Sequence, residues 1–181
     1  LAPYGSGDTK ATAVIAERYG VPMVAAAAAT PSVFDQNFQN LFGILFPNRM
    51  ITDQEVAYYK KAAPDVKRVA ILALNSLFPK AIAAELAESA KAGGYEVVYN
   101  TIYSPDTSDF SNALTQIKGL NPDWIYATGY TQDLITIRRQ MNDLGVTAKI
   151  VSMTAGPAYP EFAENVKALA ENITTNSWWH E

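Results

Sequence analysis

The sequence predicts an α/β protein in which a parallel, Rossmann-like sheet is sandwiched between helices. From Val66 onward, short β-rich runs alternate with longer runs that carry apolar residues at helical spacing. The run at residues 69–74 is continuously apolar, which is typical of a central strand buried on both faces. Strands that alternate with helices of this length imply right-handed βαβ crossovers and a parallel sheet covered on both sides.

Residues 2–46 read as two further units of the same kind. A helical run extends to Tyr19, with Ser6 or Asp8 as the residue that starts it. The five alanines at 25–29 have high helix propensity, but Pro22 and Pro31 leave little length for a helix, and Pro31 biases Thr30 away from helical geometry. We therefore expect an extended segment at 23–26 that leads into a loop of small residues.

The later elements follow from the same periodicity. Glycines at 93–94 and 145 stand where helix caps fall, and Pro79 suits a first helical turn. Turn residues at 46–53, with Thr52 or Asp53 as a cap, predict a domain crossover before a helix at 54–63. The expected strands are 68–74, 96–102, 124–127, 149–153 and 173–178, and the expected helices between them are 79–92, 110–120, 131–144 and 159–171.

Composition excludes several function classes. With 181 residues, 49% of them hydrophobic, the chain can bury one good core or a core and part of another. The net charge is −4 and most of the 14 basic residues stand singly, so the basic stripe of a nucleic-acid-binding protein is missing. No apolar run reaches the ~20 residues of a membrane span. The absence of cysteine excludes disulfides, thiol nucleophiles and cysteine zinc sites.

The two ends of the sequence read as interrupted elements. Leu1 to Gly5 resembles the end of a strand and the loop after it, and Glu181 follows an apolar run without a stop signal. We expect the sequence to be a fragment of a longer protein.

Two loops of small residues stand before predicted helices, where free backbone N–H groups favour an anion. The run from Gly5 to Lys10 departs from a phosphate-binding loop, because Thr9 precedes Lys10 and Ala11 follows it. A plain helix cap and contact with a carboxylate both remain open for this loop.

Three further loops follow predicted strands and should share one sheet edge. They are Asn75 to Phe78, Thr128 to Thr131 and Met153 to Gly156. Ligands of open parallel sheets bind outside the carboxyl ends of the strands. Their aromatic, small polar and glycine residues favour an organic solute, although ordinary loop packing explains each one alone.

Signatures of enzymes are missing. His180 is the one histidine and stands at the chain end, and neither a Gly-x-Ser-x-Gly elbow nor a His-Glu-x-x-His pair occurs. Asp106 and Asp109 read as the start of a helix, and the Asn172 sequon falls in a predicted strand. We expect no enzyme activity, no cofactor and no metal site.

Several stretches together resemble the branched-chain amino-acid binding proteins, which are type I periplasmic solute-binding components of ABC transporters. They are Gly20 to Val24 with the loop to Pro31, Lys67 to Leu72, Tyr103 to Phe110 and Asn121 to Tyr130. The resemblance implies two lobes joined by three crossovers that close on a ligand like a hinged trap. By this analogy 1–47 is part of the first lobe, 48–177 is the second lobe, and 178–181, with Trp178 and Trp179, begins the return crossover.

The resemblance also implies ligand-binding residues. In the family, first-lobe loops bind the ligand carboxylate and second-lobe loops supply aromatic rings. We expect the site residues to be Tyr4, Ser6, Ala27, Ala29 and Thr30 in the first lobe and Phe78, Tyr130 and Thr154 in the second.

Thr154 departs from the family pattern, because amino-acid binders keep an acid there for the ammonium group. Burying an ammonium without a countercharge costs several kcal/mol, on the order given for unpaired ions. Asp133 or a residue beyond this chain could supply that charge. Otherwise the site should prefer a carboxylic or keto acid, and Phe78, Tyr130 and Trp178 suit an aromatic or apolar body.

The resemblance implies a transporter permease as partner and a periplasmic or other extracytoplasmic location. A branched-chain amino-acid or amide binder and the ligand-sensing domain of a receptor or regulator are alternative interpretations. An α/β enzyme such as a nucleotide-dependent transferase is a third class.

Overall fold

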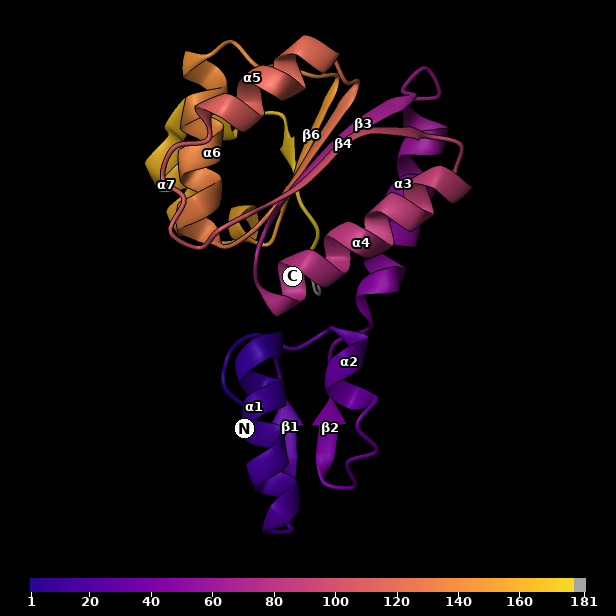
Figure 1. Cartoon of the computed structure of the whole chain (residues 1–181), viewed down its shortest axis with the longest axis vertical. Helices are drawn as coiled ribbons and strands as arrows, with labels where there is room; N and C mark the ends of the chain where they lie inside the picture. Colours follow the sequence, from indigo (N-terminus) through magenta and orange to yellow (C-terminus); the bar gives the residue numbers. More distant parts are fainter. Residues whose placement is uncertain (178–181) are drawn as a thin grey trace.

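Two parallel sheets of unequal size organise the chain in this computed structural model, which describes residues 1–177 (Figure 1). The return crossover expected at 178–181, with Trp178 and Trp179, lies outside the described residues. The smaller sheet pairs β1 (Met23–Ala25) with β2 (Leu41–Gly43). It packs with helices α1 (Ser6–Arg18) and α2 (Pro31–Phe34).

The larger sheet has five parallel strands in the order β4-β3-β5-β6-β7. Its strands are β3 (Arg68–Leu74), β4 (Glu96–Tyr103), β5 (Trp124–Thr128), β6 (Ile150–Thr154) and β7 (Ile173–Thr174). The predicted α/β fold class with a parallel sheet is confirmed.

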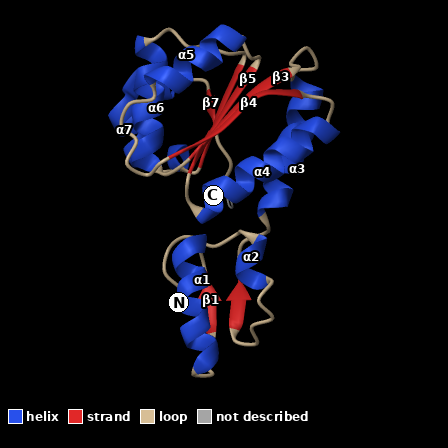
Figure 2. Cartoon of the chain, viewed as in Figure 1, coloured by secondary structure: helices blue, strands red, loops and turns tan. Residues whose placement is uncertain are grey.

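Helices cover both faces of the larger sheet (Figure 2). On one face lie α3 (Asn48–Ala62) and α4 (Leu77–Ala92), and on the other lie α5 (Ser111–Leu120), α6 (Thr131–Asp143) and α7 (Pro160–Val166). Short 3₁₀ helices η1 (Gly156–Ala158) and η2 (Lys167–Ala170) flank α7.

Strand β3 divides the core between these two helix layers. Ala70, Leu72 and Leu74 pack with α5, α6 and α7, whereas Val69 and Ile71 pack with α3 and α4. All these side chains are at most 5% exposed. The continuous apolar run therefore corresponds to a strand that is buried on both faces, as the sequence predicts.

Trp124 anchors the face under α3 and α4. Its ring meets Tyr59 and Tyr95 edge to face, with centroids 5.0 and 5.6 Å apart, and its indole N–H donates to the Ser152 hydroxyl at 2.7 Å. Because the ring is fully buried, this hydrogen bond satisfies a donor that would otherwise be unpaired.

The predicted start of α3 is wrong. The helix begins at Asn48, six residues before the expected start at 54, and Thr52 and Asp53 lie inside it instead of capping it. The Asn48 N–H donates to the Ala29 carbonyl and its side-chain amide donates to the Thr30 hydroxyl. These tertiary contacts, which local propensity does not encode, fix the helix start.

The C-terminal elements are shorter than predicted. The helix expected at 159–171 breaks at Lys167, whose φ is 52°, and continues as η2. Arg138 and Arg139 of α6 donate to the carbonyls of Leu169 and Asn165, which ties this segment to α6. Strand β7 has two residues instead of the predicted 173–178, and 175–177 are not in a strand.

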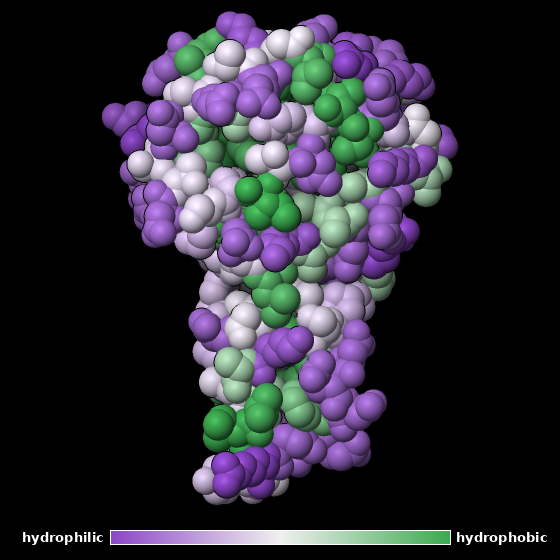
Figure 3. All heavy atoms as spheres, in the orientation of Figure 1, coloured by the Kyte–Doolittle hydropathy of each residue, from purple (hydrophilic) through white to green (hydrophobic). Residues whose placement is uncertain are grey.

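The smaller sheet buries less of its apolar surface than the larger one. Large apolar side chains that stay about half exposed or more around it are Val14, Ile15, Tyr19, Val21, Phe42 and Ile44. Hydrophobic residues are also visible at the narrow waist between the two parts of the molecule (Figure 3). Within residues 1–177, no helix combines the length and the apolar character needed to cross a bilayer.

Candidate functional site

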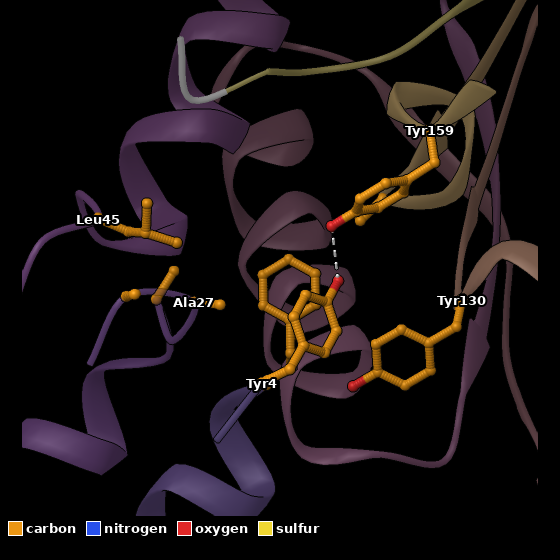
Figure 4. Close-up of a pocket in the computed structure, with 10 residues that line it drawn as sticks. Tyr4, Ala27, Leu45, Tyr130 and Tyr159 are labelled. Atoms are coloured by element: carbon orange, nitrogen blue, oxygen red, sulfur yellow. Dashed lines mark hydrogen bonds between the residues drawn. The ribbon is translucent and has the colours of Figure 1, made fainter. Parts of the chain in front are cut away.

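A cleft lies at the waist, where the end of the smaller sheet meets the helix N-termini of the larger one (Figure 4). It holds about 490 Å³ of free space, counting its open mouth. Both parts of the molecule line it, with Tyr4, Gly5, Ala26, Ala27, Ala29 and Leu45 on one side and Phe78, Tyr130, Ala155 and Tyr159 on the other.

The first wall is built from the loop before α1 and the alanine-rich loop after β1. Gly5 is the N-cap of α1 at φ 90°, a backbone conformation that favours glycine, and its N–H donates to the Ala27 carbonyl. The Ser6 hydroxyl accepts from the N–H groups of Ala29 and Thr30 at 3.3 and 3.4 Å. The small side chains of this loop leave its backbone close to the cleft.

Ser6 and Thr30 lie behind the lining. Both are at most 2% exposed, and the Thr30 hydroxyl accepts from Asn48. The expectation that Ser6 or Asp8 caps α1 is wrong, because no side chain caps this helix and Ser6 holds the alanine-rich loop instead.

The second wall comes from three helix or strand ends. Phe78 lies in the first turn of α4, Tyr130 is the N-cap of α6, and Ala155 follows β6. Thr154 does not line the cleft, because it is 1% exposed and its hydroxyl donates to the Asn176 side chain at 2.6 Å. Asp133 accepts from the Tyr130 N–H at 3.0 Å and is not among the lining residues.

Three tyrosines close one end of the cleft. The hydroxyls of Tyr4 and Tyr159 face each other at 3.2 Å (Figure 4). The rings of Tyr4 and Tyr130 meet edge to face with centroids 6.3 Å apart. Partial burial, followed by the bond to Tyr159, raises the pKa of Tyr4 above its usual range, so this hydroxyl stays protonated at neutral pH.

Sequence reasoning missed five lining residues, which are Gly5, Ala26, Leu45, Ala155 and Tyr159. Tyr159 stands five residues after Thr154, at the sheet edge where we expected ligand-facing loops, so its position carried a usable signal. Leu45 lies in the short segment between β2 and α3, and nothing local marks it as facing a cleft.

None of the ten lining residues carries a formal charge. Helices α1, α4 and α6 begin at or next to lining residues, and helix N-termini carry partial positive charge. No side chain caps α1 or α4. Among residues 1–177, no group of acids and histidines is placed to hold a metal ion. The cleft can therefore hold an uncharged or anionic organic molecule by backbone and aromatic contacts.

A second cavity of about 830 Å³, counting its open mouth, lies beside α3 and the segment after β7. Glu55, Tyr59, Thr174 and Asn176 are among its lining residues, and Tyr59 hydrogen-bonds Thr174. Burial raises the pKa of Glu55 to about 7, although a hydrogen bond with Ser152 opposes this shift. This carboxyl group thus titrates near neutral pH away from the cleft.

All 181 residues match a family of known proteins described as periplasmic binding protein. The chain belongs to this family. The structure agrees with the resemblance read from the sequence, since the larger sheet and its helices have the fold of a type I periplasmic-binding-protein lobe.

Relatives of this periplasmic binding protein are named as branched-chain amino-acid binders. The Leu/Ile/Val-binding protein BraC3 of Rhizobium johnstonii is 28% identical over 178 residues, which are 98% of this chain and 48% of that protein. The chain thus spans about half the length of this relative.

Two solved structures show the same fold. The leucine-binding protein LivK of Thermotoga maritima superposes with a TM-score of 0.88 at 24% identity, over 98% of this chain and 50% of that one. The branched-chain amino-acid binding protein LivJ of Streptococcus pneumoniae, in complex with isoleucine, gives 0.79 at 26% identity, over 96% and 49%.

Proposed function

We propose that this chain forms part of the solute-binding protein of an ABC transporter. It binds a small carboxylate outside the cytoplasm and catalyses no reaction on it. One observation carries the proposal: an uncharged cleft with walls from two separate sheets. We assign residues 1–47 to one lobe and residues 48–177 to the other. The segment between β2 and α3 is one of the crossovers that would act as a hinge. Closure of the lobes around the ligand would signal the permease.

Backbone groups and helix ends favour an anionic ligand. Small residues at Gly5, Ala27 and Ala29 let a carboxylate approach the N-terminus of α1 and the loop backbone. No lysine or arginine lines the cleft to compete for that role.

The lining disfavours an α-ammonium group. Thr154 stands at the position where amino-acid binders keep an acid, and its hydroxyl is bonded to Asn176. Asp133 accepts from the Tyr130 N–H and lies outside the lining. A buried ammonium without a countercharge would cost several kcal/mol, on the order given for unpaired ions. The ligand class is therefore a carboxylic or keto acid.

The rings around the cleft favour an aromatic or bulky apolar body. Phe78 and Tyr130 come from one part of the molecule and Tyr4 from the other, so closure brings aromatic surface to both sides of a ligand. Edge-to-face or stacked rings add about 0.5–1.5 kcal/mol beyond area burial.

A branched-chain amino acid is the second candidate, and the names of the relatives favour it. It would require a carboxylate from a part of the protein beyond this chain. Two matched ligand pairs separate the candidates, because each keto acid differs from its amino acid only at the α position: 4-methyl-2-oxopentanoate against leucine, and phenylpyruvate against phenylalanine.

Isothermal titration calorimetry on the full-length protein tests the proposal. We expect each keto acid to bind about a hundredfold more tightly than its amino acid, equivalent to about 3 kcal/mol. Tighter binding of leucine than of its keto acid would contradict the carboxylate proposal and favour the amino-acid binder.

A variant pair localises the site. Phe78→Leu should weaken phenylpyruvate about three- to tenfold while changing the aliphatic keto acid less, because it removes a ring contact. Tyr19→Ala is the matched control, since Tyr19 is 71% exposed at the far end of α1. Equal loss for both ligands in Phe78→Leu would argue against a ring-specific contact.

A further inference from the structure

We propose that a groove outside the Tyr4–Tyr159 pair is a second subsite, which takes the distal end of an elongated aryl carboxylate through a gate formed by the two tyrosines. The proposal rests on the proposed function, because it places the carboxylate of the same ligand in the cleft. It extends that function to ligand length and to the chemistry of the distal group.

The cleft and the groove share one wall. Tyr4, Tyr130 and Tyr159 line both spaces. The groove adds Thr131, Pro160 and Glu161 and holds about 890 Å³, counting its wide mouth. These three tyrosine side chains therefore lie between the cleft and a wider groove that is open to solvent.

The gate can open by side-chain rotation alone. Tyr4 is 55% exposed and Tyr159 is 44% exposed, so neither ring is locked in a core. Their hydroxyls meet at 3.2 Å, longer than the usual 2.7–2.8 Å of such hydrogen bonds. Opening exchanges one weak hydrogen bond for contacts with water or ligand.

The backbones on either side of the gate are held in place. The N–H of Gly5, next to Tyr4, donates to the Ala27 carbonyl at 3.1 Å. The Tyr159 N–H donates to the Gly156 carbonyl, and the Tyr159 carbonyl accepts from Phe162, both at 3.0 Å. The side chains can swing without displacing the cleft walls.

The groove favours a hydrogen-bond donor at the distal end of the ligand. Glu161 is its one charged lining residue, and the carboxylate accepts from the Gln132 side chain at 2.6 Å with further acceptor sites left over. The Thr131 side chain adds a hydroxyl nearby. The ligand class is an aryl carboxylate with a flexible arm that ends in a hydroxyl or an amine.

The test compares three ligands on the full-length protein by calorimetry and stopped-flow fluorescence: benzoate, 4-(3-hydroxypropyl)benzoate and 4-(3-aminopropyl)benzoate. We expect the arms to strengthen binding about tenfold over benzoate by adding buried area and a charge-assisted hydrogen bond. Tyr159→Ala should speed association of the two long ligands about tenfold, and Tyr159→Phe about threefold because it removes only the hydrogen bond. Benzoate association should change less than threefold in both variants.

Glu161→Gln tests the distal contact. It should weaken the amine ligand about tenfold, because a charged hydrogen bond becomes neutral, and leave benzoate unchanged. Tyr19→Ala again serves as the control for a tyrosine away from the cleft. Thermal melting of each variant establishes that the fold is retained, and the conservative Tyr159→Phe change keeps the test valid if Tyr159→Ala unfolds.

Two failures can be told apart. If benzoate and the keto acids bind but the arms add nothing, or if Tyr159 and Glu161 variants leave the long ligands unaffected, the second subsite is overturned alone. If no carboxylate binds while leucine does, the proposed function fails and the subsite fails with it.

Discussion

Glu55 should make the stability of the larger sheet depend on pH near neutrality. Burial raises the pKa of this carboxyl group from an ordinary 4.5 to about 7. Glu55 lies on α3 and forms a hydrogen bond with Ser152. Burial raises the pKa of the neighbouring Tyr59 to about 12, so this hydroxyl stays protonated near neutral pH. The Glu55→Gln substitution keeps the shape of the protonated acid and removes the titration.

The sign follows from proton linkage. Between pH 4.5 and 7 the folded chain holds a proton that the unfolded chain has released, so stability falls as pH rises. The contribution is fully present below 4.5 and is lost as pH rises through about 7. The pKa difference predicts a loss of about 2.5 kcal/mol in the free energy of unfolding between pH 5 and pH 8 from this group.

Urea denaturation followed by the fluorescence of buried Trp124 measures this effect. The drop in unfolding free energy from pH 5 to pH 8 should be about 2.5 kcal/mol larger in the wild type than in Glu55→Gln. Glu164→Gln is the matched control, because Glu164 is exposed on α7. An equal pH dependence in wild type and Glu55→Gln would refute the reasoning.

Four further substitutions test the packing around the cleft and the core, each by urea denaturation. Gly129→Ala should destabilise the protein by about 1–3 kcal/mol, because the added carbon would overlap the Tyr103 hydroxyl. Unchanged stability would mean that this ring moves freely. Gly7→Ala, with nothing within 4 Å, should stabilise α1 by about 0.5–1 kcal/mol. Ser6→Ala leaves two N–H groups of the alanine-rich loop without their acceptor and should lower the free energy of unfolding by about 1–2 kcal/mol. A smaller decrease would show that these long hydrogen bonds contribute little to stability. Trp124→Phe should cost about 2 kcal/mol through a small cavity and a lost hydrogen bond, and a loss below 0.5 kcal/mol would argue against both.

Part of the candidate site could be predicted from residues at strand ends. Tyr4, Ala27, Ala29, Phe78 and Tyr130 line the cleft. The family resemblance implied these residues, and all of them stand in loops that come after strands or at the starts of helices. Ser6, Thr30 and Thr154 stand next to lining residues in the sequence, yet their hydroxyls bond within the protein. Sequence position fixed the loop for each residue but not the direction of its side chain.

The misplaced element boundaries have the same origin. Helix α3 begins at Asn48 because its backbone and side chain bond the loop at Ala29 and Thr30, about twenty residues earlier. The helix after Tyr159 breaks at Lys167, where Arg139 of α6 binds the Asn165 carbonyl before the break and Arg138 binds the Leu169 carbonyl after it. Contacts between distant segments override local helix propensity in both places.

The sequence by itself determined the α/β class, the parallel orientation of the strands and the burial of β3 on both faces, because these depend on periodicities within single elements and on the alternation of strands with helices. The order of the strands in the sheet came only from the tertiary structure. Only the tertiary structure decided which residues enclose the cleft. Tyr4 and Tyr159 are 155 residues apart, and their contact exists only because two sheets from different parts of the chain meet there. Local patterns carry no information about such a meeting, since it depends on the packing of whole layers.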